Sequence, residues 1–417
     1  MKVKRTEQIY IGENETISKL CHISKNLYNQ SNYVLKQQFI KKEKLSSYND
    51  LVKLFQNPSE NDGENNYQKL PAQTAQWTIR KAREAWDSFF KAMRAWKKRP
   101  ENFIEMPKPP KYKNKNGEFI LIFTNQQCKI DDGILKFPKI MNLEVKTRLD
   151  DVNLREVRVI PQGIGYIIEI VYMKEIEDIA KGETHRIMGI DIGLRNIVTI
   201  GDSISNEGIA VKGGVLKSIN QFFNKEYARL RSISDRQIGS KQLTNREKRL
   251  FQKRNRKVND VMHKLSKVII QYAKSKNIDT IIIGHNNGWK QSADIGKRNN
   301  QNFVQLPFNT LINQIRYKAE EIGINVIVQD ESHTSECSFL DNESIEHHET
   351  YVGKRIKRGM FKSAKGTLIH ADLQASYNII KKAVPEAFAD GIEGIGLYPR
   401  SLSIPEFTGM ITSKGRC

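Results

Sequence analysis

The stretch RIMGIDIGLRNIVTIGD, residues 186–202, decides how the second half of this chain folds. Two apolar runs, 187–192 and 196–201, flank a short polar turn, and this pattern predicts two β-strands. Asp191 lies near the end of the first run. Because a buried carboxylate is costly unless it is paired or bound to a metal, this residue is a candidate for a functional site. Two alternatives stay open: a turn-forming Asp, and the D-x-G phosphate loop of actin-like ATPases.

The chain downstream of this stretch alternates between strand and helix patterns. We expect a long helical region, then a strand, a helix and a final strand, at 217–275, 279–284, 308–322 and 324–329. Such alternation predicts a mixed or parallel sheet covered by helices.

The first half of the chain predicts a different architecture. Strand-like alternation at 2–11 is followed by helical patterns at 17–42 and 70–98, a polar break at 57–66 and a Pro- and Lys-rich connector at 106–117. Short strands separated by turns come next and predict a small β-barrel or sandwich, into which the helices are inserted. These strands are 118–123, 127–131, 134–137, 143–146, 154–160 and 164–173.

The composition points to a polyanionic partner. The 417 residues include 68 Lys and Arg against 47 Asp and Glu, which gives a net charge of +21 and a pI near 9.6. A charge of this size favours nucleic acid over an anionic membrane surface, because no amphipathic helix with a broad apolar face is evident. No apolar run approaches the ~20 residues of a membrane span, and the N-terminus lacks the apolar core of a signal peptide. With four scattered cysteines, we expect a protein of the bacterial cytosol or nucleoid.

A second candidate carboxylate is Asp372, in the first turn of a predicted helix whose sequence is IHADLQASYNIIKK (369–382). Ala375, Ile379 and Ala383 line one face of this helix. Taken alone, Asp372 reads as a helix cap worth ~1 kcal/mol.

Several motifs together resemble the TnpB family, transposon-encoded relatives of type V CRISPR effectors. The resemblance covers most of the chain and implies an RNA-guided DNA endonuclease with a ribonuclease-H-like (RuvC) domain. The motifs are GIDIG (189–193), VNDVMHKLSKVI (258–269) and ADLQASYNI (371–379), with LPAQTAQ (70–76), WKKRP (96–100) and KPPKYKNKNG (108–117) in the first half.

The resemblance also implies an α/β plus β-barrel architecture and its boundaries. We expect a guide RNA transcribed from the transposon end, double-stranded target DNA, no membrane, and one protein chain per RNA. A nuclease-dead, RNA-guided repressor is the alternative function. The expected parts are a wedge β-barrel (1–12 and 112–184), a helical recognition lobe (13–111), a RuvC-like nuclease (185–333 and 367–384), a basic insertion (334–366) and a C-terminal tail (385–417).

Two-metal hydrolysis of a phosphodiester needs at least three acidic side chains around two Mg²⁺ ions, for which Mn²⁺ can substitute. In the family pattern Asp191 and Asp372 supply two of them, whereas Gly284 stands where the third is expected. The strand at 324–329 should lie ~4.8 Å from the strand that ends at Gly284. We therefore predict Glu331 as a relocated third ligand, with Asp330 on the other face of the sheet. The alternative is that both are solvated acids at a strand end.

The family's four-cysteine zinc ribbon is degenerate here. Cys337 is retained, but Leu340, Lys362 and Lys365 stand in the other cysteine positions, so we expect no zinc. His347 and His348 could only extend an incomplete ligand set.

Basic residues in three segments are candidates for nucleic-acid contacts. Trp289 and Lys290, which follow Asn286 and Asn287, are candidates for the rim of the catalytic cleft. The candidate contacts are Arg246, Lys248, Arg249, Lys253, Arg254, Arg256 and Lys257 in one predicted helix, Lys354, Arg355, Lys357 and Arg358 in the basic insertion, and Gln73 and Thr74 at the start of the 70–98 helix.

Overall fold

The computed structural model describes residues 1–57, 65–176, 186–237, 243–286, 306–389, 391 and 394–414. The chain divides into two compact units, Lys2–Glu175 and Ile176–Cys417, with Met1 joining the second. Each unit is described by itself. Most of the polar break at 57–66 and all of 287–290 lie outside the described residues.

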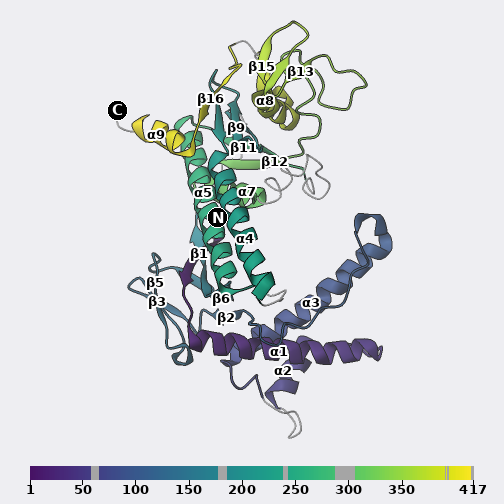
Figure 1. Ribbon diagram of the computed structural model, residues 1–417, viewed down its shortest axis with the longest axis vertical. Helices are drawn as coiled ribbons and strands as arrows, with labels where there is room; N and C mark the ends of the chain where they lie inside the picture. Colours follow the sequence, from purple (N-terminus) through teal and green to yellow (C-terminus); the bar gives the residue numbers. More distant parts are fainter. Residues whose placement is uncertain are drawn as a thin grey trace. The chain divides into compact units, whose positions relative to one another are not determined.

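The described residues of the first unit include the α-helices (Figure 1) α1 (Glu15–Ile40), α2 (Tyr48–Gln56) and α3 (Ala72–Lys98). Asn14 caps α1 by accepting a hydrogen bond from the Ile17 N–H. The fully buried Trp86 of α3 donates its indole N–H to Asn32 of α1, 2.8 Å away. Trp86 and Phe89 of α3 are thus core residues.

The strands of the first unit form two separate sheets. One has the order β1-β7-β6-β2 and consists of β1 (Lys2–Ile11), β2 (Leu121–Thr124), β6 (Asn153–Pro161) and β7 (Tyr166–Glu175). The other has the order β3-β4-β5 and consists of the three-residue strands β3 (Lys129–Asp131), β4 (Ile134–Lys136) and β5 (Glu144–Lys146). Among the described strands no closed barrel forms, because β1 and β2 are the two edges of the larger sheet and do not pair with each other.

The second unit is built on a six-stranded sheet with the order β12-β11-β8-β9-β10-β16. β8, β9 and β10 are antiparallel, whereas β11 is parallel to β8, β12 to β11 and β16 to β10. The predicted neighbourhood of the 279–284 and 324–329 strands is confirmed. The strands are β8 (Ile187–Asp191), β9 (Asn196–Asp202), β10 (Gly208–Lys212), β11 (Thr280–Gly284), β12 (Asn325–Gln329) and β16 (Pro399–Leu402).

Helices cover both faces of this sheet. One core cluster joins Met188, Ile190 and Ile283 of the sheet to residues of α4 (Gly214–Gln237), α5 (Asn245–Ser275), α7 (Phe308–Glu320) and α9 (Ile404–Lys414). A second cluster joins Ile187 and Ile282 to α8 (Ala371–Ala383). Figure 1 shows α4 and α5 as two long helices side by side. The helical region predicted over 217–275 is therefore confirmed for the residues that the structure describes there.

A small antiparallel sheet follows β12 in the chain and leads into α8. It contains β13 (Lys354–Lys357), β14 (Met360–Lys362) and β15 (Leu368–His370). Phe361 and Ile369 from this sheet are buried in the same cluster as α8. Within the described ranges no helix is long and apolar enough to cross a membrane.

Candidate functional site

The carboxyl ends of three neighbouring strands reach the same edge of the six-stranded sheet. Ile190 of β8 pairs with Ile283 of β11, and Gly284 of β11 pairs with Gln329 of β12. Asp191 therefore ends β8 at the level of Gly284, and Glu331 follows β12 by two residues. Polar side chains meet at this edge because parallel strands end there together.

The packing of α8 decides which face of the sheet carries these side chains. A Cβ atom on Gly189 would clash with the main-chain oxygen of Ser376 in α8, so α8 lies directly against β8. Since side chains alternate along a strand, Asp191 shares the face of Gly189. Asp372, in the first turn of α8, is brought to this same face.

The third acidic residue, Glu331, occupies space that glycine leaves open. A Cβ atom on Gly284 would lie 2.9 Å from Oε2 of Glu331 and 2.5 Å from Cδ1 of Ile379 in α8. Real Cβ atoms essentially never approach other atoms this closely, so a side chain at 284 would require the Glu331 carboxylate and the end of the Ile379 side chain to shift. The Glu331 carboxylate thus lies on the α8 face, where a side chain from position 284 would otherwise project.

The electrostatics of the three carboxylates reflect their burial and their mutual charge. Burial raises the pKa of Asp191 well above its usual range, and the negative charges of Asp372 and Glu331 raise it further. Burial also raises the pKa of Glu331 to about 7, with the charge of Asp330 adding to the effect. The guanidinium of Arg355 opposes the shift at Asp191. A group of acids that repel one another in this way favours a bound cation.

Two asparagines fix the carboxylate-bearing segments, and sequence reasoning missed both. Asn196, 8% exposed at the start of β9, donates from Nδ2 to Oδ2 of Asp372 over 2.9 Å. The Glu331 N–H donates to Oδ1 of Asn286 over 2.9 Å. The signal for Asn196 was its position as a polar residue opening a fully buried strand. The signal for Asn286 was weaker, because it lies in a loop.

Asp330 differs from Glu331 in its surroundings. Its side chain is 59% exposed and forms an ion pair with Lys382, 3.1 Å away. Hydrogen bonds from Ser332 lower its pKa, with Lys382 contributing. Asp330 is therefore satisfied as a solvated anion, while Glu331 is half-buried beside Gly284.

The oxygen atoms of the three carboxylates suit a hard divalent cation. Three carboxylates offer only oxygen ligands, which is the set that Mg²⁺ prefers. Across the described ranges, no three His, Cys, Asp or Glu side chains are arranged so that they could hold a metal ion as they stand.

The segment in which the sequence predicts a degenerate zinc ribbon is held together by hydrogen bonds to two carboxylates. Oδ2 of Asp341 accepts from the Ser338 hydroxyl at 2.6 Å and from the Ala364 N–H at 2.8 Å. It thereby joins the turn that follows Cys337 to the turn between Lys362 and Lys365, the two places where the family pattern has cysteine pairs.

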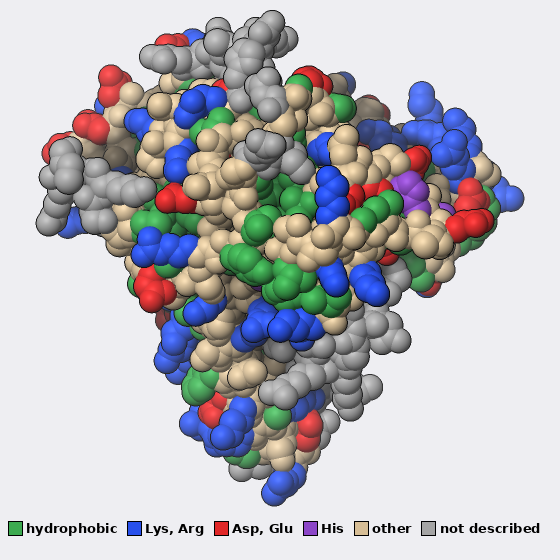
Figure 2. Space-filling model, turned by 90° about the horizontal axis from the view of Figure 1, so that it is seen from above, with side chains coloured by type: hydrophobic (Ala, Val, Ile, Leu, Met, Phe, Trp, Pro, Cys, Tyr) green, Lys and Arg blue, Asp and Glu red, His purple; other side chains and the backbone are tan. Residues whose placement is uncertain are grey.

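Glu343 adds a second cross-link within this segment. Its carboxylate accepts from the Ser338 N–H at 2.6 Å and from the Val352 N–H at 2.9 Å. Cys337 is buried, and its thiol donates to the Glu346 carbonyl at 3.5 Å. His333 contacts Glu336 at 3.0 Å, and the purple histidines in Figure 2 lie beside red acidic side chains.

The predicted nucleic-acid residues fall into three groups in the structure. On α5, Arg254 is half-buried and donates to Asn220 of α4 at 2.9 Å, which makes it a helix-packing residue as well. The other α5 candidates are exposed except for the partly buried Lys248. Figure 2 shows blue Lys and Arg side chains scattered over the visible face.

In the basic insertion, Lys354, Arg355, Lys357 and Arg358 are all exposed. Nη2 of Arg355 lies 3.9 Å from Oδ1 of Asp372, so the structure brings this group to the carboxylates.

At the start of α3 the two candidates differ. Thr74 is fully buried, which corrects the expectation that its side chain reaches a duplex. Gln73 is partly exposed and donates to Gln126 at 2.5 Å, while Thr124 donates to Gln73.

Two family models match this chain. Residues 166–290, which include Asp191 and Gly284, match the model OrfB_IS605, described as a probable transposase. Residues 308–379, which include Glu331 and Asp372, match the Cas12f1-like TNB domain. A curated relative, the TnpB-like protein ORF457 of Acidianus two-tailed virus, is 27% identical over 88% of this chain and 83% of its own length. The predicted resemblance to the TnpB family is confirmed.

One solved structure supports the fold, and a second is reported beside it. A Cas12f1–sgRNA–target DNA complex is 14% identical and gives a TM-score of 0.51 over 87% of this chain and 81% of that chain. The mini-RNA-guided endonuclease CRISPR-Cas_phi3 is 10% identical and gives a TM-score of 0.49 over 96% of this chain and 94% of that chain. At 14% identity, the likeness to the Cas12f1 complex is evidence for the fold alone.

Proposed function

We propose that this TnpB-like protein is an RNA-guided DNA endonuclease that cuts DNA at a single centre made by Asp191, Glu331 and Asp372. The carrying observation is the position of Glu331, whose Oε2 fills the space beside Gly284 on the face covered by α8. Without this relocation the centre would have two carboxylates, too few for two-metal hydrolysis. One centre would cut both DNA strands in turn.

The chain's own residues have distinct roles in this proposal. The three carboxylates would hold two Mg²⁺ ions, which when bound supply Lewis-acid stabilisation and an activated water. Asn196 holds the Asp372 carboxylate through its 2.9 Å hydrogen bond, and Asn286 holds the main chain at Glu331. Arg355, close to Asp372, presents a guanidinium to the phosphate of the DNA strand.

The proposed partners are a guide RNA and double-stranded DNA that carries a short motif beside the target. Support comes from the net charge of +21 and from the exposed basic residues of α5 and of the insertion. It also comes from the Cas12f1 relative, whose structure is that of a complex with sgRNA and target DNA. In such complexes the protein reads backbone and shape, while base pairing reads the sequence.

The test is cleavage of a target plasmid by protein purified with its own RNA. Sequencing that RNA defines the guide, and a plasmid that carries the matching target is then incubated with Mg²⁺ or Mn²⁺. We expect the wild type to cut the plasmid and Asp191→Ala to bind it without cutting. Binding without cleavage by the wild type would contradict the nuclease proposal and favour the repressor function.

A further inference from the structure

A stripe of polar side chains on α1 fastens the Lys-rich connector along the helix. The stripe residues are spaced four and three positions apart and therefore share one helix face. The residue numbers of their partners increase as those of the stripe residues decrease, so the connector runs antiparallel to α1. The contacts are Asn32 to the Pro110 carbonyl (3.3 Å), Asn29 to the Lys113 carbonyl (3.0 Å) and N–H (2.8 Å), Lys25 to the Lys115 carbonyl (2.6 Å), His22 to the Gly117 carbonyl (3.2 Å) and Ser18 to the Glu118 carboxylate (2.6 Å).

These contacts hold residues 110–118, called the strap below, along α1. The stripe covers roughly 21 Å of helix at 1.5 Å per residue, and the facing connector segment spans at most ~29 Å when fully extended. Lys25 is 2% exposed, and burial lowers its pKa. A buried ammonium that binds a main-chain carbonyl fixes the strap and leaves the strap's own side chains outside.

The exposed side chains of the strap are basic. Lys111, Lys113 and Lys115 are all exposed. The Lys113 ammonium lies over the rings of Tyr28 and Phe119, at 4.9 Å and 5.0 Å from their centroids. Such a row of cations lowers the electrostatic cost of bringing a phosphate backbone to this surface.

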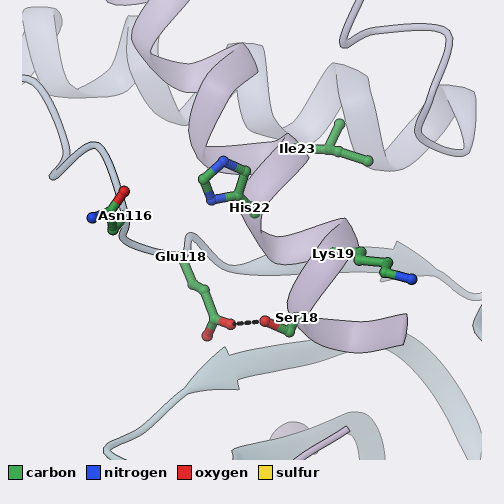
Figure 3. A pocket seen from close by; sticks show the side chains of 6 residues that line it. All are labelled: Ser18, Lys19, His22, Ile23, Asn116 and Glu118. Carbon is green, nitrogen blue, oxygen red and sulfur yellow. Dashed lines mark hydrogen bonds between the residues drawn. The ribbon is translucent and has the colours of Figure 1, made fainter. Parts of the chain in front are cut away.

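The strap ends at a pocket of about 420 Å³, lined by Ser18, Lys19, His22, Ile23, Asn116 and Glu118. Figure 3 shows that Lys19 extends away from Glu118, whose carboxylate lies with the side chains of His22 and Asn116 on the opposite side of the helix. The polar part of the pocket thus has a carboxylate, an imidazole and an amide.

The Glu118 carboxylate is held in one orientation. Its Oε1 accepts from the Ser18 hydroxyl at 2.6 Å and from the Tyr166 hydroxyl at 3.0 Å. These two bonds do not use Oε2, which is left as an acceptor. A fixed carboxylate oxygen beside an imidazole suits the amino edge of a nucleobase, because carboxylates accept from exocyclic amino groups and rings stack on histidine.

We infer that this pocket binds an unpaired nucleobase that carries an exocyclic amino group, in a nucleic-acid strand whose backbone follows the lysines of the strap. The inference rests on the proposed function, since it names a part of the nucleic-acid partner that the function requires. At the position of that amino group uracil and thymine carry a carbonyl oxygen, which the carboxylate repels.

The test uses the full chain and fluorescent homopolymers of adenylate, cytidylate, uridylate and deoxyadenylate, with binding measured by fluorescence anisotropy. In Glu118→Gln the side-chain oxygen keeps the Ser18 and Tyr166 donors, so the amide NH₂ takes the place of Oε2 and becomes a donor. We expect the adenylate-to-uridylate affinity ratio to fall on the order of tenfold, since one base-edge contact is worth about 1–3 kcal/mol. Comparing adenylate with deoxyadenylate shows whether the strand is RNA or DNA.

Glu43→Gln removes the same charge from an exposed site beyond the end of α1 and should leave the ratio unchanged. Melting temperatures establish that both variants fold. An unchanged ratio in folded Glu118→Gln, or equal binding of adenylate and uridylate by the wild type, would overturn the inference. Neither result depends on cleavage, so Asp191→Ala should keep the wild-type ratio even if the protein proves not to be a nuclease.

Discussion

The Glu331 carboxylate occupies the space into which a side chain at Gly284 would project: a Cβ atom at 284 would lie 2.9 Å from the Glu331 Oε2. The absence of a side chain at the end of β11 thus leaves room for the glutamate that follows β12. This relationship explains how a strand that ends without a carboxylate can still belong to a three-acid centre.

The first prediction concerns Gly284→Ala. The added methyl group must displace either the Glu331 carboxylate or Cδ1 of Ile379, and overpacking of this kind costs about 1–3 kcal/mol. We expect a lower melting temperature and slower cleavage. Adding Ile379→Val removes the Cδ1 atom and should restore stability more than activity. Wild-type rates in Gly284→Ala would contradict the assigned position of Glu331.

Moving the carboxylate from position 331 to position 284 tests whether the two positions are equivalent. Gly284→Glu should inactivate the protein because two carboxylates compete for one space. Gly284→Glu combined with Glu331→Gly and Ile379→Val should regain part of the cleavage. The measurement is the initial rate of plasmid cleavage with Mg²⁺, and a triple variant no more active than Gly284→Glu would argue against equivalent positions.

The degenerate zinc ribbon should depend on Asp341 for its stability. Asp341→Ala leaves the Ser338 hydroxyl and the Ala364 N–H without their acceptor, which costs about 1–3 kcal/mol. The exposed Glu349→Ala is the matched control and should change stability by less than about 0.5 kcal/mol. Thermal unfolding measures both, and zinc chelators should not shift the wild-type curve. Stoichiometric zinc in the purified protein would contradict this account.

Lys318 should make stability depend on pH in the alkaline range. Burial lowers its pKa to about 8 from 10.5, while its ammonium donates to the His263 carbonyl and to Ser266. The unfolded chain therefore binds this proton more tightly than the folded chain does, which lowers the free energy of unfolding. This destabilisation is complete below pH 8 and vanishes as the pH rises through 10.5. Lys318→Met should be more stable than the wild type by about 1–2 kcal/mol at neutral pH, discounted for partial exposure.

This advantage should disappear as the pH approaches the ordinary pKa of lysine. Lys225→Met, on the exposed side of α4, serves as the control. Chemical unfolding at several pH values gives the difference directly. A constant difference across the range would show that Lys318 does not titrate in this way.

Local patterns predicted the elements that carry the candidate site. Asp191 ends an apolar strand, and the sequence pattern of a strand at 279–284, a helix at 308–322 and a strand at 324–329 predicted β11, α7 and β12 in that order. The position of Glu331 could be predicted from the sequence because the alternation of side chains along β12 fixes the face of the sheet on which it lies.

Other parts depend on contacts between distant segments. β10 and β16 are short, and β16 begins with Pro399, so neither gives a strong strand pattern, yet they pair in parallel across the chain. The barrel prediction failed because six short strands cannot specify which edges meet. Asn196 was missed because its partner, Asp372, lies 176 residues away.

The most direct test of the central claim is the rate of guide-directed plasmid cleavage by Glu331→Ala compared with Asp330→Ala. The two residues are neighbours in the chain, but Asp330 is exposed and paired with Lys382. Even partners of metal ligands cost about 10–100-fold when removed. We therefore expect Glu331→Ala to lose more than about 100-fold, as Asp191→Ala does, while Asp330→Ala cuts like the wild type. Wild-type cleavage by Glu331→Ala, alongside an inactive Asp191→Ala, would contradict the relocated carboxylate.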